Sequence, residues 1–271
     1  MRRAYVDGPF GQIHYQYADR ELAAGARPLV LLHQAIMAGG QFDNVFAPLI
    51  AHGFAPIAID MPGFGLSDAP PRQPVIADYA GCVAPVLDAL GAARAAVAGH
   101  HTGALVGTEF ALAAPDRVEA LVIHGAMVLP DEERKALGDD LGARERAFAA
   151  RDEAAHFVEV AEIRHRLAQG RIGPDRLTDY VVQAMQAYRM GAYAYGHTAA
   201  FAYDHAGPLR RLALPVLLLS NTGDMTHPWA QAARDLRPDF AYAEIAGGGI
   251  DICDEDPQGW ADAIAQFLKS L

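Results

Sequence analysis

Short apolar runs alternate along the chain with segments in which apolar residues recur every three or four positions. The runs are rich in Val, Ile and Leu and are typical of strands buried on both faces of a parallel sheet. They cover residues 27–34, 54–60, 94–99, 119–125, 214–220 and 240–247. The N-terminal stretch 4–19 alternates around a Gly-Pro turn, which predicts an antiparallel hairpin.

Helix-like segments separate these strands, at 40–53, 75–92, 104–118, 228–236 and 257–271. The last segment is the clearest, because Trp260, Ile264, Phe267 and Leu268 fall on one face of a helix. Alternating strands and helices predict an α/β fold with a mostly parallel, doubly wound sheet. Ligands of such folds bind at the carboxyl ends of the strands.

One long segment, residues 129–206, contains no convincing core strand. Its first half is charged and helical, and its second half is helical and crowded with Tyr and Phe. Because it lies between two predicted core strands, we expect an inserted helical cap on a core built from residues 1–128 and 207–271.

Composition narrows the classes of function. The formal net charge of −11 disfavours nucleic acid and anionic membranes as partners, but it does not identify a substrate. The two cysteines, Cys82 and Cys253, form no disulfide framework, and with no signal-peptide pattern they favour a cytoplasmic protein. No phosphate-binding glycine motif follows the first strand, so no cofactor is expected. The sequence leaves a monomer and a homodimer both open.

Five motifs then occur in a fixed order. They are "LLHQAIMAGG" (31–40), "DMPGFGLSD" (60–68), "AGHHTGA" (98–104), "LLLSNTGDMTHP" (217–228) and "IAGGGIDICDEDP" (245–257). In this order the chain resembles the α/β-hydrolase fold family along nearly its whole length. The motifs match that family's oxyanion loop, Asp-x-Pro-Gly turn, nucleophile elbow, acid loop and terminal histidine segment.

The resemblance fails at two of the three catalytic positions. The family's nucleophile position carries His101 instead of serine, and the position of its terminal catalytic histidine carries Ile250. Only the acid, Asp224, matches. The relay in which histidine takes the proton of a serine therefore cannot operate. The resemblance implies an atypical member of the family.

An imidazole at the elbow suggests a different arrangement. It reaches further than a serine, on the order of 4–5 Å from Cα to ring nitrogen, into the space that the family's histidine fills. We therefore predict a His101–Asp224 dyad in which the carboxylate fixes the ring. His101 would act as a general base, favoured by the helix N-terminus behind it, or as a nucleophile. The backbone N–H of Thr102, with that of Gln34 or Ala35, is predicted to form an oxyanion hole.

Further residues are expected around this dyad. The predicted substrate pocket is lined by His33, His124, Tyr193, Tyr195 and Ile250. A metal bound by the strand-end histidines and Asp224 is an alternative, but no His-x-His or His-x-x-x-His pair exists, so no metal is expected. His100 is expected to pack away from the pocket, and Arg164 and His165 to lie on a solvated helix face.

These residues predict a hydrolase for a small, partly apolar carbonyl compound, such as an ester, a lactone or a diketone cleaved at a C–C bond. Two alternatives stay open. The same dyad suits a cofactor-free lyase or isomerase, since an oxyanion hole also stabilises an enolate. Loss of both the serine and the terminal histidine also suits an inactive protein that only binds ligands.

Overall fold

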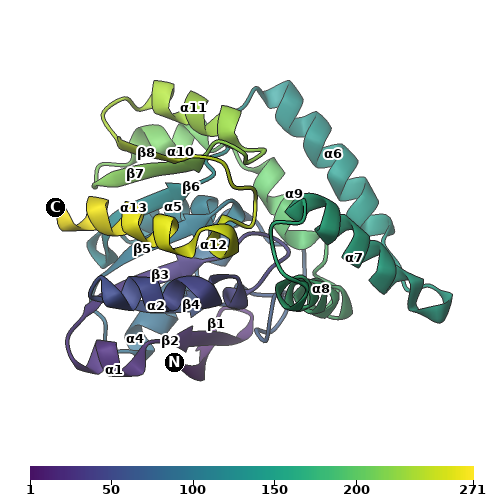
Figure 1. The fold of residues 1–271 in the computed structure, drawn as a ribbon, viewed down its shortest axis with the longest axis horizontal. Coiled ribbons are helices and arrows are strands. Elements are labelled where there is room, and N and C mark those ends of the chain that lie inside the picture. The colour runs from purple at the N-terminus through teal and green to yellow at the C-terminus, as the bar shows by residue number, and fades with distance from the viewer.

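The computed structural model describes residues 1–271 as one eight-stranded sheet with helices on both faces (Figure 1). The strands are β1 (Arg2–Gly8), β2 (Gly11–Tyr17), β3 (Arg27–Leu32), β4 (Phe54–Ile59), β5 (Ala95–His100), β6 (Val118–His124), β7 (Val216–Asn221) and β8 (Ala241–Ile245). Their order is β1-β2-β4-β3-β5-β6-β7-β8, antiparallel for the N-terminal hairpin and parallel from β4 to β8. The predicted fold class is confirmed.

Helices cover the two faces of the sheet and one of its ends. Those of the core are α1 (Asp19–Ala23), α2 (Asp43–Ala51), α3 (Ile76–Ala80), α4 (Val83–Ala89), α5 (Thr102–Ala113), α10 (Ala206–Arg211), α11 (His227–Leu236), α12 (Ile252–Glu255) and α13 (Pro257–Lys269), with 3-10 turns η1 (Gly39–Phe42) and η2 (Pro115–Arg117). Between β6 and α10 lie α6 (Asp131–Ala147), η3 (Asp152–Ala154), α7 (Ala155–Ala168), α8 (Pro174–Arg189) and α9 (Tyr195–Ala202). We refer to α6 to α9 as the helical insertion.

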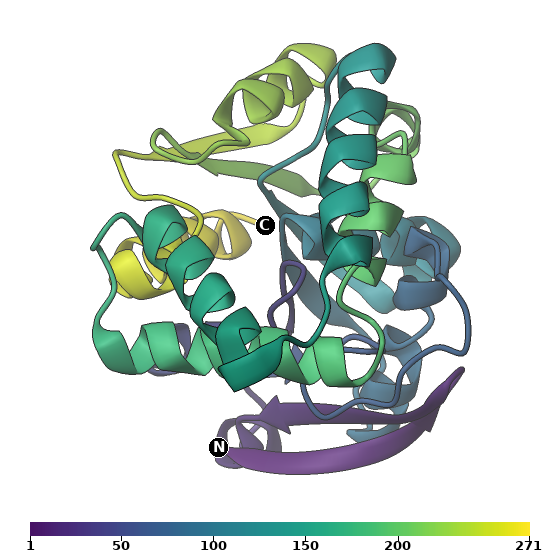
Figure 2. The same cartoon turned by 90° about the vertical axis from the view of Figure 1, so that its right-hand side faces the viewer.

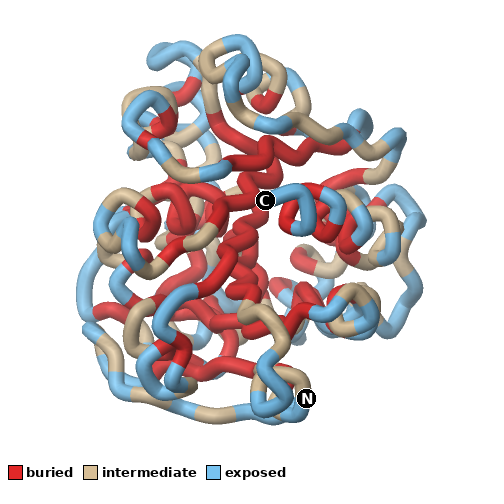
Figure 3. Tube along the Cα trace, turned by 90° about the vertical axis from the view of Figure 1, so that its left-hand side faces the viewer, coloured by how far each residue is buried: buried red, intermediate tan, exposed pale blue.

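The apolar runs are buried because successive side chains of a strand point to opposite helical layers. In β3, Leu29 and Leu31 pack in the cluster formed with α2 and α13, whereas Val30 and Leu32 pack in the cluster formed with α5. Figure 3 shows the resulting band of buried segments through the middle of the molecule. β8 is an exception to the prediction. It pairs with β7 only, and as an edge strand it is partly exposed.

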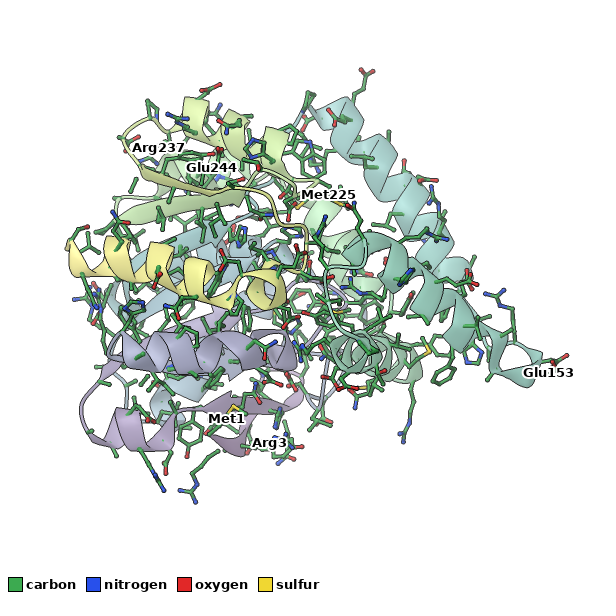
Figure 4. The ribbon with its side chains drawn as sticks, in the orientation of Figure 1. Met1, Arg3, Glu153, Met225, Arg237 and Glu244 are labelled. Carbon is green, nitrogen blue, oxygen red and sulfur yellow. The ribbon has the colours of Figure 1, made fainter.

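The helical insertion projects from the end of the sheet where the parallel strands finish (Figures 1 and 2). Glu153 marks its far tip and Met225, in the loop after β7, lies where it meets the core (Figure 4). α9 packs on the loop after β3, since a Cβ on Gly196 would lie 2.5 Å from the Cβ of Ala35. None of the helices combines the length and the apolar surface needed to cross a lipid bilayer.

Candidate active site

His101 occupies the turn between β5 and α5. Its φ of 47° and ψ of −112° form a left-handed conformation, which costs a residue with a side chain on the order of 1–3 kcal/mol. Two glycines permit the turn. A Cβ on Gly99 would overlap the backbone of Gly103, and a Cβ on Gly103 would overlap the carbonyl of Leu32. This strained turn holds the imidazole at the carboxyl end of the sheet, where α/β folds bind ligands.

His101 and Asp224, which the sequence predicts as partners, are in contact. His101 Nε2 lies 2.9 Å from Oδ2 of Asp224, whose side chain is 1% exposed. The N–H and the hydroxyl of Thr226 donate to Oδ1 at 2.7 and 2.8 Å. Burial by itself would raise the pKa of Asp224, but the His101 ring and the Thr226 N–H hold that pKa well below its usual range. Asp224 is therefore an ionised acceptor that orients the ring.

The contact with Asp224 decides which nitrogen of His101 is free. An ionised carboxylate only accepts hydrogen bonds, so Nε2 carries the proton of the neutral ring. Nδ1 then holds the lone pair, and it forms no hydrogen bond with another group of the chain. In the serine triad the aspartate holds Nδ1 and the base is Nε2. The two nitrogens exchange roles here.

Space for the His101 ring comes from Gly125, the residue directly after β6. A Cβ at this position would lie 2.9 Å from His101 Nε2 and 3.0 Å from Thr226 Oγ1, and it would overlap Cδ2 of the imidazole. The φ of Gly125 is +75°, which residues with side chains rarely adopt. Sequence reasoning missed this residue. A glycine directly after a buried strand is a usable signal, since it often marks the close approach of another group.

Two more imidazoles lie behind His101. The ring centroids of His100 and His101 are 4.3 Å apart, and those of His100 and His124 are 4.5 Å apart. Burial lowers the pKa of His124 to about 4 and that of His100 well below its usual value. His124 accepts a hydrogen bond from Trp260 Nε1 at 2.8 Å and donates to Asn221 Oδ1 at 2.9 Å. Because both of its nitrogens are bonded inside the core, His124 does not line a pocket, contrary to the prediction.

His33 has a structural position too. Its ring is fully buried, Nδ1 donates to the Gln34 carbonyl at 2.8 Å, and Nε2 accepts from the Met61 N–H at 2.9 Å. Burial lowers the pKa of His33, so the ring is neutral. With both nitrogens bonded to backbone, His33 shapes the loop after β3 and offers nothing to a ligand, contrary to the prediction.

The ligand atoms of His100, His101 and Asp224 lie within 4.8 Å of one another, which is the one arrangement in the chain suited to a metal. The hydrogen bonds oppose that use. Gln41 Oε1 accepts the Gln34 N–H at 3.0 Å, so the amide NH₂ of Gln41 faces Nδ1 of His100. Nε2 of His100 then carries the proton and has no lone pair for a metal.

The same hydrogen bond of Gln41 removes one of the candidate donors of the predicted oxyanion hole. The N–H of Gln34 is already bonded to Gln41 Oε1, so Gln34 is not a free donor, contrary to one of the predicted alternatives. The N–H of Ala35 has no partner within the chain. Thr102 is the first residue of α5, and the first N–H groups of a helix have no partner inside it. Ala35 and Thr102 are therefore the remaining pair of donors.

The three other predicted pocket residues lie in different surroundings. Tyr193 is buried within the helical insertion and stacks on Phe148, with centroids 4.5 Å apart. Tyr195 begins α9, and its carbonyl accepts a hydrogen bond from Gln73 Nε2 at 2.9 Å. Ile250 alone borders an open space beside Asp224. The structure therefore brings Ile250, but neither tyrosine, to the wall shared with the dyad.

That space is a cleft of about 210 Å³ between the core and the helical insertion. Asp224, Met225 and Ile250 line its core side, and Arg166, Leu167 and Arg171 line the side of the insertion. Sequence reasoning missed both arginines. The charged pattern around α7 indicated a solvated face and gave no sign that one side of this helix faces the dyad.

Three arginines of the insertion form ion pairs with acidic residues that follow Ile250. Their pairs are Arg164 with Asp251, Arg176 with Asp254 at 2.9 Å, and Arg171 with Glu255 at 2.7 Å. Arg164, expected on a solvated face, is buried, and its guanidinium stacks 4.6 Å from the centre of the Tyr180 ring. His165, expected beside it, is exposed. The ion pairs fasten the insertion to the core next to the cleft.

Comparison with known proteins agrees with this architecture. A family model described as alpha/beta hydrolase fold matches residues 27–256. The chain therefore belongs to the α/β-hydrolase fold family.

Individual relatives carry several names. RutD of Caulobacter vibrioides, assigned as a carbamate hydrolase, is 25% identical over an alignment of 279 positions that covers 99% of each chain. A non-heme chloroperoxidase of Streptomyces lividans is 30% identical over 217 residues, 76% of this chain and 77% of its own. The enol-lactonase of Burkholderia xenovorans LB400 superposes with a TM-score of 0.77 at 21% identity, covering 98% of this chain and 100% of its own.

Proposed function

We propose that the protein hydrolyses small, partly apolar carbonyl compounds through the His101–Asp224 dyad, without a serine nucleophile. The observation that carries this proposal is the 2.9 Å contact between His101 Nε2 and Asp224 Oδ2, which leaves Nδ1 unpaired at the elbow. Two relatives are named for acting on carbamates and enol-lactones, which both contain a carbonyl carbon bonded to a heteroatom. Esters, lactones and carbamates are accordingly the favoured substrates.

The proposed reaction begins with a water molecule beside Nδ1 of His101. Nδ1 takes a proton from the water as the oxygen attacks the carbonyl carbon of the substrate. The N–H groups of Ala35 and Thr102 stabilise the negative charge that develops on the carbonyl oxygen. Asp224 stabilises the imidazolium, which then gives its proton to the leaving oxygen or nitrogen as the C–O or C–N bond breaks.

The other nucleophilic side chains support a reaction without serine or cysteine. The sequence contains three serines, and Ser67 and Ser220 are both buried and hydrogen-bonded outside the dyad, while Ser270 lies at the C-terminus. Burial raises the pKa of Cys82 to about 12 and that of Cys253 well above its usual value. Neither thiol is an accessible thiolate.

The test is turnover of a panel of esters, lactones and carbamates by His101→Ala and Asp224→Asn. Both should lower kcat/KM by roughly 10²–10⁴-fold, the usual contribution of a general base. His165→Ala, which removes an exposed imidazole from α7, is the matched control and should keep full activity. A fluorophosphonate probe should leave the protein unlabelled.

Three results would contradict the proposal. Labelling of a serine by the probe would restore a serine mechanism. Unchanged hydrolysis by His101→Ala would remove the dyad from the reaction. Binding of apolar ligands without turnover of any substrate, unaffected by His101→Ala, would favour the inactive ligand-binding protein. Mass spectrometry of the quenched reaction distinguishes a base from a nucleophile, since only a nucleophilic His101 accumulates an acyl-imidazole.

A further inference from the structure

The cleft beside Asp224 is bordered by two arginines in a protein that is otherwise strongly acidic. The chain has a formal net charge of −11, yet Arg166 and Arg171 both border this one space. Asp224, the acidic residue of the opposite wall, forms no ion pair with either arginine, because His101 and Thr226 occupy its two oxygens.

Arg171 is held in place rather than free. Its Nε pairs with Glu255 at 2.7 Å, and its Nη1 donates to Gln169 Oε1 at 2.8 Å. Its Nη2 lies over Gly249, where a Cβ would overlap it, and makes no hydrogen bond within the chain. The Nη2 edge of this fixed guanidinium is thus left without a partner, on the wall of the cleft that leads to Ile250.

Arg166 provides the charge that nothing balances. It is exposed on α7, five residues before Arg171, and it forms no ion pair or hydrogen bond with another group of the chain. A guanidinium offers five donors in a planar fork that matches a carboxylate. The cleft therefore presents unpaired donors of two arginines, and it shares one residue, Asp224, with the dyad, whereas His101 lies behind Asp224 and does not line it.

We infer that the substrate of the dyad carries a free carboxylate, which Arg166 and Arg171 bind in this cleft while the reacting carbonyl lies at His101. The favoured class is a short-chain ester, lactone or carbamate with an acid group a few carbon atoms from the reacting bond. A cleft of about 210 Å³ has room for such a chain. This inference deepens the proposed function and rests on it.

The experiment compares two esters of equal length and leaving group, mono(4-nitrophenyl) glutarate and 4-nitrophenyl pentanoate. The wild type should prefer the carboxylate-bearing ester by about tenfold in kcat/KM, which corresponds to one charge-assisted contact. Arg166→Gln should abolish that preference by lowering kcat/KM for the glutarate ester about tenfold more than for the pentanoate. Arg166→Lys should retain part of it, because the charge remains and the fork is lost. Raising the salt concentration should weaken it, because Arg166 is exposed.

Arg189→Gln is the control, since it removes an exposed cationic side chain from the end of α8, outside the cleft. Equal kcat/KM for the two esters in the wild type, or a preference that survives Arg166→Gln, overturns the inference while the proposed function stands. If neither ester is hydrolysed, calorimetry of glutarate binding tests the carboxylate site directly. Glutarate binding that is lost in Arg166→Gln and kept in Arg189→Gln supports the carboxylate site although the proposed function fails. No glutarate binding to the wild type overturns both the carboxylate site and the proposed function.

Discussion

Replacing Gly125 with alanine tests whether the position of the His101 ring governs the chemistry. The new Cβ would lie 2.9 Å from Nε2, and it would overlap Cδ2. Carbon atoms in contact lie about 3.5–4.0 Å apart, so the ring must move by roughly 1 Å. A shift of this size breaks the 2.9 Å hydrogen bond to Asp224, because bonds longer than about 3.5 Å contribute little. We expect kcat/KM to fall on the order of 10²-fold.

A second effect of the substitution has to be separated from the first. Gly125 has a φ of +75°, and alanine in that region costs about 1–2 kcal/mol of stability. Gly91→Ala is the matched control, since Gly91 has a φ of +66° with open space around its Cβ position. It should lose similar stability and keep full activity. Chemical denaturation and steady-state kinetics measure the two quantities on both variants.

A double-mutant cycle identifies the ring as the cause. In the His101→Ala background no imidazole meets the new Cβ, and only the contact with Thr226 Oγ1 remains. Gly125→Ala should therefore cost less stability there than in the wild type, and little more than Gly91→Ala costs. If Gly125→Ala instead retains activity within twofold of Gly91→Ala, the ring position does not control the reaction. Equal stability costs of Gly125→Ala with and without the His101 ring would refute the steric argument itself.

Three further predictions follow from the buried charges and imidazoles. His205 is a buried histidine directly before α10, and its Nδ1 accepts the Met127 N–H at 3.2 Å. The folded state keeps His124 and His205 neutral, with pKa values of about 4 and about 3, whereas the unfolded chain binds protons near pH 6.5. The free energy of unfolding in urea should therefore fall as the pH drops from 7 to 5, and His205→Gln should weaken this pH dependence. A free energy of unfolding that stays constant over this pH range in the wild type would contradict the prediction. Arg164→Ala leaves Asp251 buried and unpaired, so it should lower the free energy of unfolding in denaturant by about 3–5 kcal/mol. The double variant Arg164→Met with Asp251→Leu should lower it much less. Equal losses in the two variants would refute the importance of the ion pair. The arrangement of His100, His101 and Asp224 should hold no metal, so protein purified without chelator should contain less than stoichiometric metal by elemental analysis and keep its activity in EDTA. Stoichiometric zinc would show that the proton of His100 is assigned to the wrong nitrogen.

The sheet could be predicted from local patterns in the sequence, and the meeting of the dyad from the family motifs that the chain resembles. Apolar runs of strand length mark β3 to β7 without knowledge of their neighbours. His101 directly follows β5, Asp224 comes three residues after β7, and parallel strands bring their carboxyl ends to one edge. The resemblance to the family's nucleophile elbow and acid loop assigned these residues, 123 positions apart, to one site, where the structure places them 2.9 Å apart.

The errors concern partners that no local pattern identifies. The backbone N–H of Gln34 was predicted to be an oxyanion donor, but it is hydrogen-bonded to the side chain of Gln41, in the turn of η1. His124 is enclosed by Trp260, which comes from α13. Arg164 has the neighbours of a solvated residue along the chain, but Asp251, 87 positions away, neutralises it in the interior. Each outcome depends on a pairing fixed by packing of distant segments, and a single sequence records the two members without recording that they meet.

The exchanged roles of Nδ1 and Nε2 in His101 follow from the place where the ring is attached to the backbone. Nδ1 is the ring nitrogen nearer to the backbone, and Nε2 lies across the ring from the Cβ. A ring attached to the elbow after β5 must reach across to the loop after β7, so only its distant nitrogen, Nε2, can meet Asp224. The basic atom is then left close to the elbow, beside the N–H of Thr102 at the start of α5. In the proposed reaction, a water held by Nδ1 would attack a carbonyl whose oxygen faces the helix N-terminus, so the proposed base and the proposed oxyanion donor would both come from one strained turn.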